Sequence, residues 1–293
     1  MVKNRFIEAK VKALLELFPV VAIIGPRQCG KSTLVKKMYP DWRYYDLERP
    51  DDYQLITSDT LGFFKLRPQQ TIIDEAQQYP DLFKTLRAVI DSDRSGTGRY
   101  LITGSSSPDL VKGLSESLAG RLATVELWPF KAGEFYEYEP SPLYSALSGN
   151  ISDLESILTR QACLKQDQIH EHWFFGGYPE PRIKSTQRPE FFGLWMDAYL
   201  SQYLDRDISQ LFPGINRHSF RLFIQALSFH SGQMLNQSEL ARAIEVSSPT
   251  IKQYLEILHN TFVWRNLRSF GKSSFKKIQK MPKGFYRGSG ILH

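Results

Sequence analysis

The chain has 293 residues, of which 42% are hydrophobic and 23% charged, with a net charge of +6 and two cysteines. That length suits two domains, or one large domain with an appendage, and the composition is that of a soluble globular protein. No apolar run approaches the ~18 residues of a membrane span, no signal-peptide cleavage pattern opens the chain, and two cysteines make no disulfide framework. We therefore expect a cytoplasmic protein with no membrane partner.

Positive charge is concentrated at the end of the chain. The sequence up to Glu256 is close to neutral, whereas the sequence after it contains eight basic residues and no acidic one. Such a pattern favours a polyanion partner such as duplex DNA, although a solvated basic tail is the commoner reason for it. The eight residues are Arg265, Arg268, Lys272, Lys276, Lys277, Lys280, Lys283 and Arg287.

A phosphate-binding motif follows the first predicted strand. Residues 5–18 have the spacing of an amphipathic helix, and the apolar, β-branched run 20–24 indicates a buried strand. Gly25, Gly30, Lys31 and Ser32 then complete the pattern G-x-x-x-x-G-K-[ST], and the pattern from Lys31 onward is helical. In this motif backbone N–H groups and a helix N-terminus bind phosphate oxygens, the lysine pairs with the β- and γ-phosphates, and the serine hydroxyl ligates Mg²⁺.

An ordinary strand-to-helix turn rich in Gly and Lys rarely meets so many constraints at once. We therefore predict a nucleotide site, with ATP and Mg²⁺ as cofactors. The predicted nucleotide contacts are Gly25, Pro26, Arg27, Gln28, Cys29, Gly30, Lys31, Ser32 and Thr33.

Two carboxylates end the third predicted strand. Residues 42–47 are expected to form the second strand, and Asp74 and Glu75 close the run 71–75. A buried strand that ends in two carboxylates is unusual, because unpaired charge at the edge of a core is costly. Beside an Mg²⁺-nucleotide, Asp74 would hold the metal through water and Glu75 would orient the attacking water. The alternative is a polar turn after an edge strand, which the position of the pair beyond the phosphate loop disfavours.

A further buried strand is predicted over residues 99–107, with hydroxyl groups at its carboxyl end. Ligands bind outside the carboxyl ends of parallel strands, so Thr103, Ser105 or Ser106 is expected to contact the γ-phosphate or its water. Ser107 and the proline after it also have the pattern of a helix start. The two interpretations are compatible, with Ser107 as a cap and Ser105 as a sensor.

Arg121 precedes the last predicted strand of the core, residues 122–127. An arginine at such a corner is either an arginine finger, which stabilises transition-state charge, or a structural guanidinium bound to nearby carbonyls. The sequence favours neither interpretation.

Longer strings resemble a widespread prokaryotic family of AAA-class P-loop ATPases, whose C-terminal module contains a winged helix and a nuclease-like fold. The matching strings begin at Gly25, Ile72, Leu101, Leu118, Glu126, Phe175, Tyr203 and Pro282. The resemblance therefore spans nearly the whole chain. The site residues that it implies are Lys31, Ser32, Asp74 and Glu75 at the nucleotide, Ser105 near the sensor position, and Arg121 as a finger candidate.

The chain departs from that family at two points. It stops at His293, where relatives continue, and Gly288 stands where many relatives have Asp. The resemblance therefore gives no basis for nuclease chemistry and implies a truncated family member. We expect the last residues to be poorly ordered without the missing elements.

A winged helix is predicted in the second half of the chain. Asn236 with a glutamate three residues later resembles a capping box, and Ser248 with Pro249 is expected to start a second helix. A hairpin-like wing begins within residues 261–270. The outward face of the second helix has only Lys252 as a basic residue, fewer than a DNA-reading helix usually has. The module therefore either binds DNA through its basic wing and tail, or serves packing and partner contact.

Four segments follow from these patterns. We expect an AAA-type ATPase core with a parallel α/β sheet over residues 1–137, and a helical connector or lid over 138–215. A winged helix is expected over 216–270, and a basic tail, the start of a truncated module, over 271–293.

The predicted function is Mg²⁺-dependent ATP binding and hydrolysis that drives a conformational switch. The alternative is a nucleotide-gated DNA-binding or protein-interaction module with little turnover, and a homo-oligomer or a protein client is a further candidate partner. Glu75 favours hydrolysis, whereas the basic tail favours the module. A small-molecule kinase fits less well, because adjacent Asp and Glu suit water activation better than a substrate hydroxyl.

Overall fold

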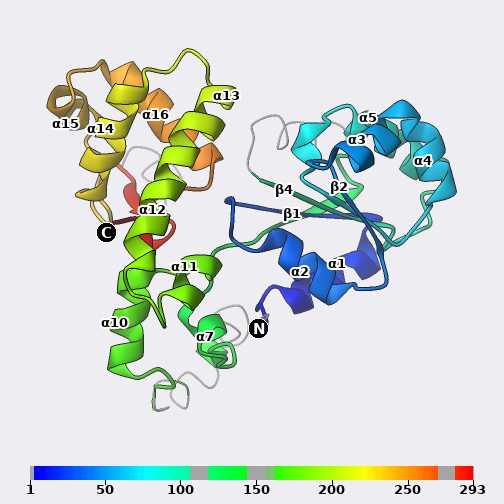
Figure 1. Ribbon diagram of the computed structural model, residues 1–293, viewed down its shortest axis with the longest axis horizontal. Helices are drawn as coiled ribbons and strands as arrows, with labels where there is room; N and C mark the ends of the chain where they lie inside the picture. Colours follow the sequence, from blue (N-terminus) through cyan, green and yellow to red (C-terminus); the bar gives the residue numbers. More distant parts are fainter. Residues whose placement is uncertain are drawn as a thin grey trace.

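The computed structural model describes residues 3–105, 118–143, 157, 159, 162–269 and 281–292. A layered α/β core and a mainly helical C-terminal half lie side by side (Figure 1). Within the described residues, no helix has the length and apolar character needed to cross a membrane.

A five-stranded, wholly parallel sheet forms the middle of the core, with the strands in the order β2-β3-β4-β1-β5. The strands are β1 (Val20–Gly25), β2 (Arg43–Asp46), β3 (Thr71–Asp74), β4 (Tyr100–Ser105) and β5 (Leu122–Glu126). The predicted parallel α/β core is confirmed. Because the carboxyl ends of parallel strands share one edge, the loops after β1, β3 and β4 meet there.

Helices cover both faces of the sheet, so the interior strand β1 is apolar without interruption. Along β1, Val21 and Ile23 belong to the cluster with α1 and α2, whereas Ala22 and Ile24 belong to the cluster with α3, α4 and α5. This alternation is the period of two expected for a strand. The helices are α1 (Glu8–Leu17), α2 (Lys31–Met38), α3 (Pro50–Ser58), α4 (Thr60–Leu66) and α5 (Leu82–Ser92), and η1 (Ala76–Gln78) is a short 3₁₀ turn.

One long helix runs through the C-terminal half (Figure 1). It consists of α12 (Phe191–Gln202), a π-helical segment η2 (Tyr203–Ile208) and α13 (Ser209–Leu211). The shorter helices before it are α7 (Ala132–Phe135), α10 (Gln166–Phe175) and α11 (Pro179–Lys184).

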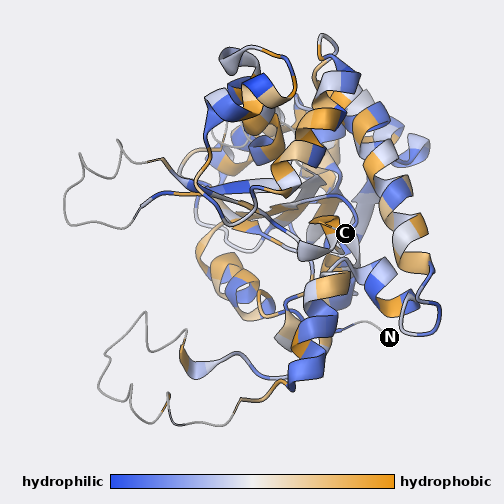
Figure 2. Cartoon of the chain, turned by 90° about the vertical axis from the view of Figure 1, so that its left-hand side faces the viewer, coloured by the Kyte–Doolittle hydropathy of each residue, from blue (hydrophilic) through white to orange (hydrophobic). Residues whose placement is uncertain are grey.

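Three helices and a strand pair complete the C-terminal half. They are α14 (Arg217–Ser228), α15 (Gln237–Ala243), α16 (Ser248–Asn260) and the antiparallel strands β6 (Trp264–Leu267) and β7 (Lys283–Tyr286), followed by a 3₁₀ turn η3 (Ser289–Leu292). Figure 2 shows hydrophobic and hydrophilic residues along the same helices. In α14 four hydrophobic residues share the buried face, namely Phe220, Phe223, Ile224 and Leu227, so this helix packs by one face.

Two local predictions need correction. The N-cap of α16 is Ser247 rather than Ser248, because the Ser247 hydroxyl accepts from the Thr250 N–H at 3.2 Å. The end of the chain is not loose over residues 281–292, since β7 pairs with β6 and Tyr286 is buried. The predicted cap at Ser107, and four of the eight basic residues after Glu256 (Lys272, Lys276, Lys277 and Lys280), lie outside the described residues.

The two halves meet at an aromatic contact next to the end of β5. The guanidinium of Arg287 lies 3.9 Å from the ring centre of Trp128, and it pairs with Glu126 at 3.4 Å. Phe262, which follows α16, packs edge-on to the same Trp128 ring at 5.7 Å. This contact joins residues that flank the hairpin to residues at the end of the sheet.

Candidate functional site

The phosphate loop connects the end of β1 to the start of α2. Gln28 and Gly30 have φ values of 60° and 95°, in the left-handed region that glycine adopts without strain. A Cβ at Gly25 would lie 2.1 Å from the carbonyl oxygen of Leu127, so only glycine fits there. Steric constraints therefore explain why glycine occupies both positions of the motif. The loop ends at the N-terminus of a helix, which favours the binding of an anion.

Lys31 is folded back over the phosphate loop. Its Nζ donates to the carbonyl oxygens of Gly25 at 3.3 Å and Pro26 at 3.0 Å, and the residue is only 4% exposed. Its ammonium group therefore lies inside the loop rather than in solvent, where a phosphate would meet a fixed positive charge.

Ser32 and Asp74 are brought together by α2 and β3. The Ser32 side chain lies close enough to the Asp74 carboxylate to lower its pKa, and this carboxylate accepts hydrogen bonds from the hydroxyls of Thr103 and Tyr44. Asp74 is 2% exposed, and burial raises its pKa despite these hydrogen bonds. Mg²⁺ prefers oxygen ligands, and a serine hydroxyl and a carboxylate both supply them. The buried carboxylate also lacks sufficient positive charge around it. These two residues therefore fit the metal.

Glu75 lies beside Asp74 in a left-handed backbone conformation, with φ of 53°. Its Oε2 accepts from the Ser105 hydroxyl at 2.6 Å and from the side-chain amide of Gln77. Burial acts to raise its pKa, but Lys31 and these hydrogen bonds outweigh burial and lower it. Glu75 is therefore ionised at neutral pH, held by groups on β4 and η1.

Two residues around these carboxylates were missed by sequence reasoning. Gln77 donates to both Glu75 and Ser105, the latter at 3.1 Å, and Tyr44 donates to Asp74. Gln77 lies two residues beyond Glu75, within the same short turn, and Tyr44 is on the strand next to β3. Strand adjacency could have indicated Tyr44, but only if the order of the strands had been known.

The remaining loop residues differ in exposure. Cys29 is fully buried, with Sγ 3.5 Å from the Leu127 carbonyl oxygen, and burial raises the pKa of its thiol. Its side chain therefore packs in the core. Gln28 and Thr33 are exposed, and Pro26 is buried. Arg27 is ion-paired to Asp207 at 3.1 Å.

Arg121 lies at the opposite edge of the sheet. Leu122 pairs with Val20 at the amino end of β1, whereas the phosphate loop follows the carboxyl end. Six strand residues separate the two edges, about 20 Å at roughly 3.3 Å per residue. Arg121 is bound to Asp91 at 2.7 Å. A finger role can therefore concern only the nucleotide of another chain.

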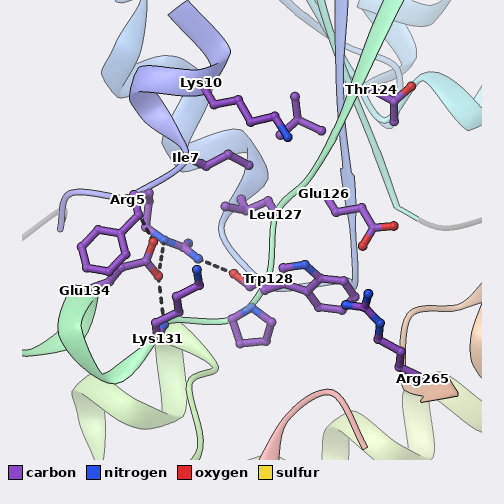
Figure 3. Close-up of a pocket in the computed structure, with 13 residues that line it drawn as sticks. Arg5, Ile7, Lys10, Thr124, Glu126, Leu127, Trp128, Lys131, Glu134 and Arg265 are labelled. Carbon is purple, nitrogen blue, oxygen red and sulfur yellow. Dashed lines mark hydrogen bonds and ion pairs between the residues drawn. The ribbon is translucent and has the colours of Figure 1, made fainter. Parts of the chain in front are cut away.

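A separate hollow of about 570 Å³ borders β5 (Figure 3). A buried cation in its lining, Arg5, pairs with Glu134 at 3.3 Å and donates to the carbonyl oxygens of Cys29, at 3.1 Å, and Trp128. Figure 3 shows Arg5 turned toward Glu134 and Trp128. Arg5 therefore supports the back of the phosphate loop, a contact that sequence reasoning also missed.

Comparisons with known proteins match the two halves of the chain to different families. Residues 17–136 match a family described as an AAA domain, and residues 166–293 match one described as a domain of unknown function (DUF8612). The chain is 33% identical over 296 residues to two mycobacterial relatives, covering all of this chain and 59% of each of them. These are the uncharacterized protein Rv2008c of Mycobacterium tuberculosis and the uncharacterized protein Mb2031c of Mycobacterium bovis.

A solved structure shares the fold. The Walker-type ATPase PABY2304 of Pyrococcus abyssi superposes with a TM-score of 0.59 at 13% identity, over 99% of this chain and 95% of that one. At that identity the likeness shows the fold alone. Together with the AAA match over residues 17–136, the shared fold supports an AAA-class P-loop core in the first half of the chain.

Proposed function

We propose that the chain binds ATP with Mg²⁺ and hydrolyses it, and that this cycle drives a conformational switch of the C-terminal half. The observation that carries the proposal is the convergence of three loops. The phosphate loop brings Lys31 and Ser32, β3 brings Asp74 and Glu75, and β4 brings Ser105. This convergence supports phosphoryl transfer to water, which needs a phosphate-binding cation, metal ligands and a group that orients water close together.

Each residue has a definite task in this scheme. Lys31 and the N–H groups of the loop bind the phosphates, and Ser32 and Asp74 hold the metal. The metal, when bound, neutralises charge on the phosphate oxygens. Glu75 is ionised and fixed by Ser105, so it orients the attacking water and accepts its proton.

Nucleotide binding is the first test. Replacing Lys31 with Ala removes a buried point charge, so ATP affinity should fall about 10- to 100-fold, since charged hydrogen bonds contribute ~1.5–3 kcal/mol. Calorimetric titration of ATP with Mg²⁺ measures it. Lys37→Ala is the matched control, because Lys37 lies on the same helix but pairs with Glu8 at 2.8 Å. Unchanged affinity in Lys31→Ala would contradict the site.

A second candidate function concerns the C-terminal half. We propose that α14, α15 and α16 with β6 and β7 form a winged helix that binds duplex DNA with little sequence preference, as a nucleotide-gated module. The supporting observation is the exposure of Arg265, Arg268 and Lys283 along the strand pair. The outward face of α16 offers only Lys252 as a basic group, so phosphate contacts would dominate over base contacts.

Salt dependence tests this candidate. About four phosphate contacts predict a slope of log K against log salt near −3.6, and replacing the three exposed residues with Gln should flatten it by about 2.7. Fluorescence anisotropy of duplex DNA at several salt concentrations measures the slope. The control replaces Lys65, Lys84 and Arg87, three exposed basic residues of α4 and α5. Equal slopes for both variants, or no binding at ~50 mM salt, would exclude the strand pair as a DNA contact.

A further inference from the structure

The phosphate loop is held from the C-terminal half by an ion pair. Arg27 in the loop places Nε 3.1 Å from Oδ1 of Asp207 in η2. The two side chains are largely shielded from solvent, with 29% and 14% of their surfaces exposed. A short contact between partly buried groups stabilises more than an ordinary surface pair does. At the exposed rim of this contact, Glu48 lies 3.9 Å from Arg27 and 3.4 Å from Arg206, so Asp207 is the nearer and more buried partner of Arg27.

The two aspartates of η2 face different surroundings. Asp205 is 62% exposed and lies 3.8 Å from Arg217, within the C-terminal half. Asp207, two residues later, faces the phosphate loop. A π-helical turn holds an extra residue, so it changes the faces on which the following side chains lie, and such turns occur frequently at functional sites. The segment therefore directs one carboxylate to the candidate nucleotide site.

Asp207 is close enough to that site to act on its charges. Burial raises the pKa of Asp207, Arg27 and to a lesser degree Arg206 lower it, and Glu75 raises it further. Burial likewise acts to raise the pKa of Glu75, and Arg27 is among the groups that lower it. The Arg27 guanidinium thus interacts with both the carboxylate proposed to orient water and a carboxylate from the C-terminal half.

We propose that the phosphates of ATP compete with Asp207 for Arg27, so that binding of a triphosphate releases η2 from the phosphate loop. This inference rests on the proposed function, because it requires a nucleotide at the loop. Guanidinium groups form charge-assisted, often bidentate hydrogen bonds with phosphate oxygens. When Arg27 turns to the nucleotide, Asp207 keeps its partly buried position without its paired cation and with only the more distant charge of Arg206, which destabilises the contact.

Release of η2 would reach the rest of the C-terminal half directly. Tyr203, Leu204 and Ile208 belong to the same apolar cluster as α14 and α16. The Tyr203 hydroxyl also shares a hydrogen bond with Thr261 at the end of α16. Since packed cores shift between discrete arrangements rather than deforming continuously, movement of η2 repacks these helices. The ion pair therefore reports the occupancy of the loop to the proposed winged helix.

The test is a double-mutant cycle on nucleotide affinity in the full chain. Dissociation constants for ADP and for a non-hydrolysable ATP analogue are measured for wild type, Asp207→Asn, Arg27→Gln and the double variant. Asp207→Asn removes the competitor, so the analogue should bind about two- to tenfold more tightly, and ADP should change less. Asp205→Asn, the matched control in η2, should leave both affinities unchanged, and Asp207→Glu should restore the wild-type values.

The Arg27→Gln background shows whether Arg27 is the group that changes partner. There the analogue should bind more weakly, and Asp207→Asn should have no further effect. Tightening that persists without Arg27, or an equal loss of both nucleotides in Asp207→Asn, would overturn the exchange. Thermal melting of each variant checks that it is folded.

A second measurement follows η2 itself. Hydrogen exchange of the amides of residues 199–208 should increase in wild type when the ATP analogue binds, and should already be high in Asp207→Asn. If wild type binds no nucleotide, the proposed function fails. If wild type binds and exchange over these residues is unchanged, the function stands and the release of Asp207 by Arg27 is wrong.

Discussion

The two edges of the central sheet carry charge in different ways. At the carboxyl edge Asp74 is buried, and burial raises its pKa even though hydroxyl groups surround it. At the amino edge Arg121 and Asp91 form a 2.7 Å ion pair near solvent, and the hydrogen bond from Arg121 lowers the pKa of Asp91. The carboxyl edge therefore holds a carboxylate whose charge its surroundings do not fully stabilise. At the amino edge, each charge of the Arg121–Asp91 pair is stabilised by the other.

This difference supports our proposal that the carboxyl edge is the functional edge of the sheet and the amino edge a structural one. Burying a carboxylate without sufficient positive charge costs stability, and such groups gather where a ligand supplies the missing charge. An exposed ion pair contributes little to the free energy of unfolding, and its two charges already compensate each other without a ligand. Three substitutions test whether the contrast holds.

The largest expected effect is a loss of turnover on replacing Arg121 at the amino edge, and it requires that chains assemble. If chains assemble so that Arg121 reaches the nucleotide of a neighbour, Arg121→Ala should lower turnover about 10³- to 10⁵-fold while sparing ATP binding. Phosphate release at a series of protein concentrations measures it, since turnover should then rise steeply with concentration. A concentration-independent rate that is normal in the variant would leave Arg121 as a structural partner of Asp91.

A smaller but unconditional effect is expected at the carboxyl edge. Glu75→Gln keeps the shape of the side chain and removes the charge that polarises water, so turnover should fall about 10²- to 10⁴-fold. Binding of ATP with Mg²⁺ should remain, as measured by calorimetry beside a phosphate-release assay. Turnover equal to wild type would place the base elsewhere.

The smallest expected effect is a change in melting temperature, and this change has opposite signs for variants of Asp74 and Glu75. Folding raises the pKa of Asp74. The folded protein is therefore more stable when Asp74 is protonated, and it loses this stability as the pH rises through the folded pKa. Asp74→Asn should therefore raise the melting temperature of the nucleotide-free chain by a few degrees at pH 7, a gain that shrinks as the pH falls toward about 4.

Glu75 provides the opposite sign for the same melting experiment. Its pKa is lowered, so its contribution to stability is present above the unfolded pKa and lost as pH falls through the folded pKa. Glu75→Gln should therefore lower the melting temperature at pH 7. A decrease in both variants would show that Asp74 is structural rather than poised for a cation.

Local features of this protein could be predicted from its sequence. The phosphate loop is contiguous, and its glycines, Lys31 and Ser32 are fixed by spacing alone. The neighbourhood of Glu75 and Ser105 also followed, because the carboxyl ends of parallel strands share one edge. Both predictions needed only local pattern and one topological rule.

Contacts between distant segments could not be predicted in this way. The pairing of Arg27 with Asp207 depends on a π-helical segment, which no pattern in the sequence predicts. The burial of Tyr286 depends on the pairing of β6 and β7 across residues 268–282. The N-cap of α16 was misplaced by one residue because two serines precede its proline and each satisfies the local rule.

The contact around Arg287 has a mechanical consequence. Its guanidinium stays charged at neutral pH although burial lowers its pKa to about 10, and it is stacked on Trp128 beside Phe262. This stack lies at the end of β5 and shares no residue with the Arg27–Asp207 pair at the phosphate loop. In the exchange proposed above, this stack would serve as a pivot at the end of β5, and the Arg27–Asp207 pair as a latch at the candidate nucleotide site. Opening the latch would then turn the C-terminal half about the pivot, so a small displacement at the phosphate loop would become a larger one at the far ends of α14, α15 and α16.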